Sequence, residues 1–88
     1  MKVQLRKVCV YTHSVDGVTF YVGKGSHARA FGVHNRNNVW RSIVGMRDTI
    51  DVEILGWYET DVEARKIETK EIRLRSPAAN IFIPKEAE

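Results

Sequence analysis

The sequence predicts an α+β domain in which a small three-stranded antiparallel sheet is flanked by helices. Three short segments, 8–13, 18–22 and 52–58, are rich in β-branched and aromatic residues and predict strands. Asp16 and Gly17 separate the first two segments, and Asp-Gly is a strong hairpin signal. The remaining segments predict helices in the order ββααβα, which is typical of a sheet packed against helices.

The length of the hairpin loop decides which side chains share a face of the sheet. A two-residue turn at Asp16 and Gly17 would pair Tyr11 with Val22 and would put Tyr11 and Tyr21 on opposite faces. A three-residue loop, with Gly17 in the left-handed region as a bulge, would pair Tyr11 directly with Tyr21. We expect the three-residue loop, because it places both tyrosines in one site.

A loop and two short helices are expected between the hairpin and the third strand. Two glycines within 23–25 predict a loop, because glycine is costly inside a strand or a helix. Segment 27–31 is expected to start a short helix and segment 38–46 to form another. The apolar residues at helical spacing in the second segment are Val39, Ile43 and Met46.

The third helix is the longest one expected. Thr60 and Glu63 have the spacing of a capping box, so the helix begins there and runs to about residue 75, before Pro77. Its expected apolar stripe consists of Ala64, Ile67, Ile72 and Leu74.

Glu68 lies inside this stripe, one turn after Ala64 and one turn before Ile72. A carboxylate at the edge of a core is costly unless it is paired or binds a cation. From the residues alone, an ion pair with an arginine and a metal site are both open. Glu71 can pair with Arg75 one turn later, so Glu68 is the better metal-ligand candidate of the two glutamates.

The length and composition predict one domain over residues 1–88, with a core at about 8–81 and a polar tail at 84–88. The single cysteine, Cys9, excludes an internal disulfide and favours a reducing cytoplasm, which would be a host's if the chain is encoded by a phage. No window approaches the roughly 18 apolar residues of a membrane span, so no membrane partner is expected.

The net charge of +3 is unevenly distributed. Residues 1–47 carry a balance of +7, and residues 48–88 a balance of −4. A basic half with interleaved amides and aromatic residues favours nucleic-acid binding over a merely solvated surface, because arginines suit bidentate phosphate contacts. The residues expected to contact nucleic acid are Lys24, Arg36, Asn37, Arg41 and Arg47.

Several short motifs together resemble the GIY-YIG endonuclease family. They are Cys9-Val10-Tyr11, Tyr21-Val22-Gly23-Lys24, Arg29, the Ala64-x-x-x-Glu68-x-x-x-Ile72 helix and Asn80. The resemblance covers about residues 8–81. The chain departs from the family pattern because cysteine replaces the first glycine, valine replaces an isoleucine, and Arg29 comes slightly early.

The resemblance implies catalytic roles for Tyr11, Tyr21, Lys24, Arg29, His34 and Asn80. It also implies that Glu68 binds a divalent ion, Mg²⁺ or Mn²⁺, and that Arg29 faces the scissile phosphate. Tyr11 is the expected general base, which requires nearby cations to lower its pKa from about 10. His34 is the rival base, because an imidazole titrates near neutrality.

The expected function is therefore a metal-dependent DNA endonuclease that nicks one strand per active site. Recognition would come from the basic half of the chain, a homodimer or an accessory DNA-binding partner. The alternative is a non-catalytic nucleic-acid-binding module of the same fold. A protein-protein adaptor fits the basic half least well.

Overall fold

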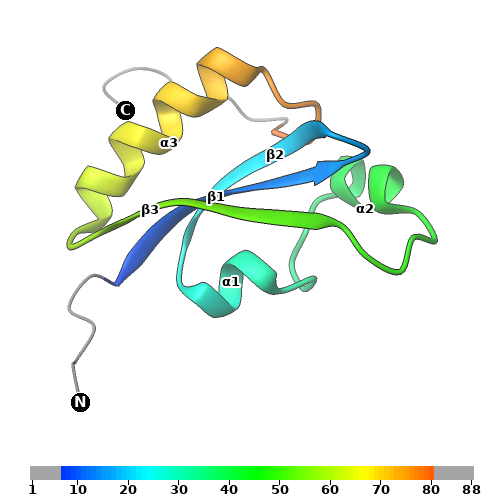
Figure 1. The fold of residues 1–88 in the computed structure, drawn as a ribbon, viewed down its shortest axis with the longest axis horizontal. Helices are drawn as coiled ribbons and strands as arrows, with labels where there is room; N and C mark the ends of the chain where they lie inside the picture. The colour runs from blue at the N-terminus through cyan, green and yellow to red at the C-terminus, as the bar shows by residue number, and fades with distance from the viewer. Residues whose placement is uncertain (1–6, 81–88) are drawn as a thin grey trace.

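The computed structural model describes residues 7–80, and the prediction of a polar tail at 84–88 lies outside this range. Six elements follow one another along the chain: β1 (Val8–Val15), β2 (Val18–Gly25), α1 (His27–Phe31), α2 (Asn38–Val44), β3 (Asp51–Tyr58) and α3 (Asp61–Arg75) (Figure 1). The strands form one antiparallel sheet in the order β2-β1-β3. The predicted α+β fold with a three-stranded antiparallel sheet is confirmed.

The hairpin turn contains two residues, so the predicted three-residue loop is wrong. Val15 pairs with Val18, and Asp16 and Gly17 between them have φ values of 52° and 80°. Two successive positive φ values are typical of a type I′ turn, whose twist matches that of the strands it joins.

A β-bulge at Phe20 then changes the register of the hairpin. Ser14 pairs with Thr19 and His13 pairs with Tyr21, so Phe20 is the extra residue. Tyr11 consequently pairs with Gly23 and not with Tyr21.

The two tyrosines nevertheless share one face of the sheet. Paired residues lie on the same face, and side chains two residues apart along a strand point the same way. Tyr21 precedes Gly23 by two residues and therefore lies diagonally across from Tyr11.

Helices cover both faces of the sheet (Figure 1). On one face, Val10 and Val22 pack with Ala64 and Ile72 of α3. On the other face, Cys9 and Tyr11 pack with Ala30 of α1. A third cluster joins the bulge, α2 and the segment after α3 through Phe20, Trp40 and Ala79.

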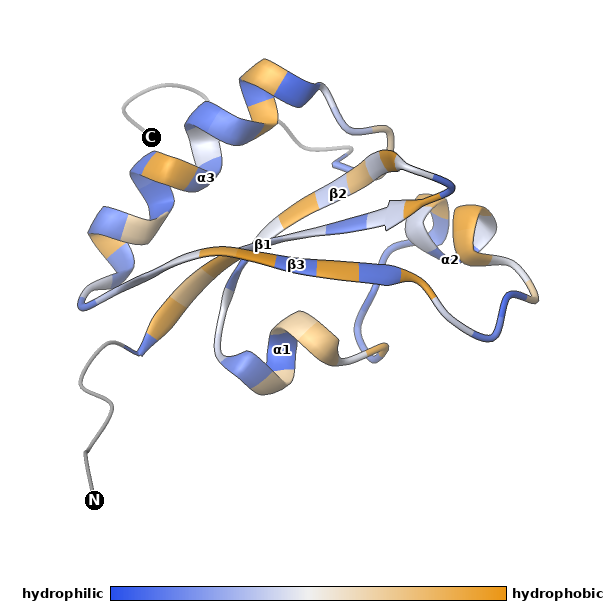
Figure 2. Cartoon of the chain, in the orientation of Figure 1, coloured by the Kyte–Doolittle hydropathy of each residue, from blue (hydrophilic) through white to orange (hydrophobic). Residues whose placement is uncertain are grey.

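The helix starts were predicted more accurately than the apolar stripes. The predicted capping box is present, with the Thr60 side chain accepting from the Glu63 N–H and the Glu63 side chain accepting from Thr60. Leu74 is 73% exposed and does not belong to the stripe, because it lies two residues after Ile72 and so on another side of the helix. Figure 2 shows hydrophobic residues of α3 interspersed with hydrophilic ones.

Met46 is fully exposed because α2 ends at Val44, earlier than predicted. Gly45 caps the helix with a φ of 57°, a conformation that glycine adopts without strain. The predicted contribution of Met46 to the helix is therefore wrong.

Gly23, Lys24 and Gly25 belong to β2 and do not form the predicted loop. They pair with Tyr11, Val10 and Cys9 of the central strand. The ladder of backbone hydrogen bonds thus outweighs the local cost of two glycines. Within residues 7–80, no helix is long and apolar enough to span a membrane.

Candidate active site

Tyr11, Tyr21 and Gly23 are in close contact on the face that α1 covers. The ring centroids of the two tyrosines are 6.3 Å apart. A Cβ atom added to Gly23 would lie 2.5 Å from Oη of Tyr11 and 2.9 Å from the ring of Tyr21. Only glycine therefore leaves room for the Tyr11 ring to cross the edge strand at this point.

The guanidinium of Arg36 lies over these tyrosines and is buried. Its carbon Cζ is 5.8 Å from the centroid of Tyr11, 5.3 Å from that of Tyr21 and 5.5 Å from that of Trp40. Arg36 Nη1 donates to the hydroxyl of Tyr11 at 3.1 Å, and Nη2 donates to the carbonyl of Gly32 at 3.0 Å. These contacts satisfy the charged group inside the protein.

Arg36 was expected on the DNA-contacting surface, and with 6% exposure it cannot contact a phosphate there. The sequence expectation fails because the chain between α1 and α2 folds back, so that carbonyl groups of Arg29 and Gly32 surround the guanidinium. Arg36 organises the tyrosine cluster instead.

Tyr11 is buried, and burial raises its pKa above the ordinary value of a phenol. The hydrogen bond and the charge of Arg36 act in the opposite direction, as does the charge of Arg29, but burial dominates. The net direction is opposite to the one that a Tyr11 base requires. Tyr11 is therefore a protonated phenol at neutral pH.

His13, which follows Tyr11 on the same face, completes the cluster. Its Nε2–H donates to the carbonyl of Ala30 at 2.7 Å, and Nδ1 accepts from Nε1 of Trp40 at 3.0 Å. Burial lowers the pKa of His13 to about 4, so the ring is neutral near pH 7. Sequence reasoning missed this residue, although its spacing of two from Tyr11 in a strand indicates the shared face.

Arg29 lies beside the end of β2 on the same side of the sheet. A Cβ atom added to Gly25 would lie 3.1 Å from Cγ of Arg29. Its guanidinium donates to the carbonyls of His34 at 2.7 Å and Asn35 at 3.2 Å. Because a guanidinium carries five N–H donors, Arg29 keeps donors for a phosphate while it holds this loop. His34 is solvent-exposed on the loop.

Glu68 lies on α3, which covers the opposite face of the sheet. Glu68 therefore does not lie on the face of the sheet that carries the two phenols. The reason is the alternation of side chains along β2. Lys24 pairs with Val10 and shares the face that α3 covers, whereas Gly23 and Tyr21 face α1.

The carboxylate of Glu68 is half-buried, as its position in the apolar stripe predicted. Burial raises the pKa of Glu68, although the charges of Lys24 and Arg65 lower it. Lys24 Nζ forms a 2.7 Å ion pair with Asp61 Oδ1, and this bond lowers the pKa of Asp61. Asp61 is a second carboxylate near Glu68 for which the sequence offered no signal.

Two asparagines singled out in the sequence have structural partners. Asn80 Oδ1 accepts from the N–H of Val22 and its Nδ2 donates to the carbonyl of Val22, each at 2.8 Å. Asn37 caps α2 by accepting from the N–H of Trp40 at 2.8 Å, and it donates to the carbonyl of Ala79 at 2.9 Å. Both amides thus hold the chain around β2.

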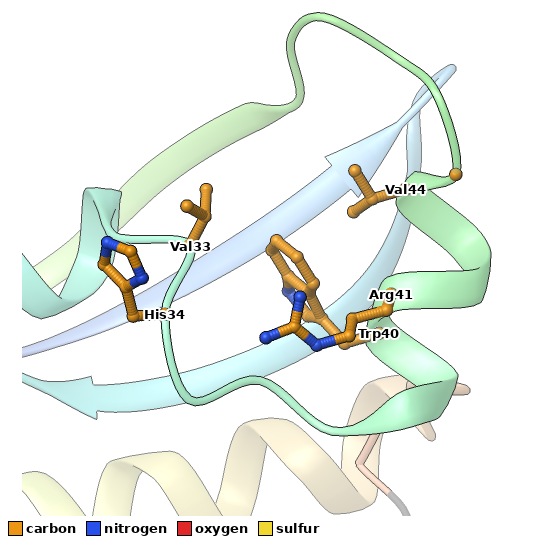
Figure 3. A pocket seen from close by; sticks show the side chains of 6 residues that line it. Val33, His34, Trp40, Arg41 and Val44 are labelled. Carbon is orange, nitrogen blue, oxygen red and sulfur yellow. The ribbon is translucent and has the colours of Figure 1, made fainter.

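The remaining basic candidates, Arg41 and Arg47, are exposed at and just after α2. Arg47 Nη1 donates to the carbonyl of Ile43 at 2.8 Å, and its Nη2 is 3.6 Å from Asp16 Oδ2. Arg41 reaches toward the loop that contains Val33 and His34 (Figure 3). Of the three arginines expected to bind DNA from this region, these two are exposed and Arg36 is not.

Candidate residues from both faces of the sheet lie near the end of β2. β2 is an edge strand, and the outward backbone groups of Val22 are bonded to Asn80. The backbone groups of Lys24 face the same outer edge, because this direction repeats every two residues. Lys24 lies near Glu68 on one side, and Gly25 contacts Arg29 on the other.

Compared with family models, with curated proteins and with solved structures, the chain has no match. The resemblance to the GIY-YIG family therefore rests on the motifs quoted above.

Proposed function

We propose that this protein is a metal-dependent DNA endonuclease whose active site lies at the outer edge of β2. The observation that supports the proposal is that Arg29 and Glu68, from opposite faces of the sheet, both lie near Lys24 and Gly25. Arg29 reaches this edge from α1, and Glu68 lies near Lys24 from α3. A scissile phosphate at this edge would meet cations from both sides.

Glu68 is the residue that would hold the divalent ion. Its carboxylate is half-buried, this burial raises its pKa, and a bound cation would offset the cost of burying the charge. Magnesium takes one or two carboxylates and keeps several waters, so one glutamate is a sufficient protein ligand. Within residues 7–80 there is no group of three or more His, Cys, Asp or Glu that could hold a metal. When bound, the ion supplies charge neutralisation for the phosphate and the leaving oxygen.

Arg29 and Lys24 would neutralise the phosphate in the transition state. Lys24 would exchange Asp61 for the phosphate, because its ion pair with Asp61 is partly exposed and Asp61 is largely exposed. Arg29 would contact the phosphate with the donors that the loop carbonyls leave unused.

The proton of the attacking water would go to His34, because its imidazole is exposed on the loop that Arg29 holds. Tyr11 has a raised pKa and 1% exposure, so we assign it a positioning role with Arg36. Tyr21 is half-buried and would orient the phosphate.

The decisive experiment is the conversion of supercoiled plasmid to open circles in the presence of Mg²⁺ or Mn²⁺. Nicking should require the metal, stop on addition of chelator, and disappear in Glu68→Gln. The matched control is Glu71→Gln. Glu71 lies three residues after Glu68 on the same helix, and its carboxylate pairs with Arg75 at 2.7 Å. That variant should nick normally.

The alternative is a non-catalytic nucleic-acid-binding module. In that case the plasmid would be retarded on a gel but left intact with every metal, and Glu68→Gln would change neither result. Loss of nicking in both glutamate variants would point to a general effect on α3 and would contradict the role of Glu68 as the metal ligand.

A further inference from the structure

The loop after α1 and the helix α2 line a pocket of about 350 Å³ that is open to solvent (Figure 3). This volume lies within the range of about 300–1,000 Å³ in which proteins bind small molecules. The lining residues are Val33, His34, Trp40, Arg41, Val44 and Gly45.

The pocket combines apolar walls with a polar rim. Val33 comes from the loop and Val44 from α2, and Trp40, which is 3% exposed, forms the floor between them. Arg41 supplies the polar side chain at the rim, whereas the ring of His34 points from the loop away from Trp40 (Figure 3). Val33 is 56% exposed and therefore leaves an apolar wall in contact with water. A nucleobase has the matching chemistry, since its faces are apolar and its edges form hydrogen bonds.

The pocket adjoins the proposed active site through Arg29. The guanidinium of Arg29 holds the loop by bonds to the carbonyls of His34 and Asn35, while its Cγ lies beside Gly25 at the end of β2. A nucleotide whose phosphate contacts Arg29 would thus have its base close to the loop wall of the pocket. Arg41 adds a positive charge at the rim for the neighbouring phosphate.

We infer that this pocket receives one unpaired nucleobase next to the scissile phosphate, and the inference rests on the proposed endonuclease function. A base inside a duplex must first be unstacked and unpaired, and this cost is smallest where the base is already unpaired. The preferred substrate is therefore duplex DNA with an unpaired nucleotide beside the cut, such as a single-nucleotide bulge.

The inference is tested by binding in chelator, where cleavage does not interfere. Fluorescence anisotropy would give Kd for a labelled duplex and for the same duplex with one bulged nucleotide. The bulged DNA should bind about tenfold more tightly, because it avoids the cost of unpairing. With 2-aminopurine as the bulged base, its fluorescence should change on binding.

Val33→Phe fills the pocket and should make the Kd values for bulged and plain duplex DNA equal. Because Val33 is exposed, the variant should fold, which its melting temperature would verify. The matched control is Val18→Phe, the same change at a valine that is 67% exposed at the hairpin. That variant should keep the preference.

Equal Kd values of the wild-type protein for the two DNAs would overturn the inference, as would a preference that survives Val33→Phe. Either result leaves the proposed endonuclease intact if the plasmid is still nicked with metal. Conversely, a pocket-dependent preference for bulged DNA without any metal-dependent nicking would support the base pocket and contradict the endonuclease.

Discussion

Arg36 Nη1 lies 3.1 Å from the hydroxyl of Tyr11, and this hydrogen bond connects two side chains that are both almost fully buried. A charged arginine in such a place is stable only because its other donors reach carbonyl groups and its flat face contacts aromatic rings. The pair fixes the position of the Tyr11 ring over Gly23. The loop between α1 and α2 is thereby tied to the central strand.

Arg36→Ala should destabilise the protein strongly. The substitution leaves the Tyr11 hydroxyl and the carbonyl of Gly32 without their partner, and we expect a loss of about 2–4 kcal/mol. Urea unfolding followed by circular dichroism would measure the change. Arg41→Ala removes an exposed arginine and should cost no more than about 0.5 kcal/mol. Similar losses in both variants would show that burial of Arg36 contributes little.

Gly23→Ala should destabilise the fold through a steric conflict with Tyr11. The new Cβ would lie 2.5 Å from Cζ and Oη of Tyr11, so the ring must move and about 1–3 kcal/mol should be lost. A double-mutant cycle with Tyr11→Leu would isolate this conflict. In the Tyr11→Leu background, Gly23→Ala should reduce the free energy of unfolding by at least about 1 kcal/mol less than it does in the wild type. If the two substitutions were additive, the destabilisation by Gly23→Ala would not come from contact with Tyr11 but from the backbone of β2.

Sequence reasoning identified those parts of the fold that short-range signals determine. Asp16 and Gly17 indicated the hairpin, and the Thr60–Glu63 pattern indicated the start of α3. The register was predicted wrongly for two reasons: the turn contains two residues and not three, and a bulge at Phe20 adds a second shift. Phe20 packs with Trp40, and its carbonyl accepts from the N–H of Ala79 at 2.8 Å. The partners of Phe20 lie outside the hairpin, so the hairpin sequence indicated the two-residue turn as one option but not the bulge.

The candidate site was predicted in the same uneven way. The half-buried position of Glu68 followed from helical periodicity. The side of the sheet on which Glu68 lies could not be predicted in this way, because it depends on which face of the sheet α3 packs against. The burial of Arg36 was also missed, since an arginine is predicted to be exposed unless its carbonyl and aromatic partners are known.

Asn80→Ala should lower stability and not only activity. The side chain makes two 2.8 Å hydrogen bonds with the backbone of Val22, and their loss from a partly buried site should cost about 1–3 kcal/mol. Thermal unfolding would detect it. Asn80→Asp keeps the acceptor for the N–H of Val22 but loses the donor to its carbonyl, so it should also be destabilised. A lower turnover at unchanged melting temperature would instead assign Asn80 a direct catalytic role.

Acid should destabilise the protein through His13. Its pKa is about 4 in the fold and about 6.5 in the unfolded chain, so between these values the unfolded chain binds more protons. The stability due to neutral His13 is complete above pH 6.5 and decreases as the pH falls toward 4. At pH 5 the loss should be about 2 kcal/mol.

Urea unfolding at pH 5 and pH 8 would measure this loss. The control variants are His27→Ala and His34→Ala, which remove exposed imidazoles and should retain the wild-type acid sensitivity. His13→Asn, which cannot titrate, should be less stable at pH 8 but should lose less stability on acidification. A wild-type acid response in His13→Asn would exclude His13 as its source.

Replacing Arg41 and Arg47 together should weaken DNA binding and reduce its dependence on salt. Each phosphate contact adds about 0.9 to the slope of log K against log salt on duplex DNA, so the double variant should lose about 1.8. Adding Arg36→Lys should change the slope no further, because Arg36 is 6% exposed and turned toward the tyrosines. Anisotropy titrations over a series of salt concentrations would provide the slopes. A slope unchanged by the double substitution would mean that the DNA does not follow α2.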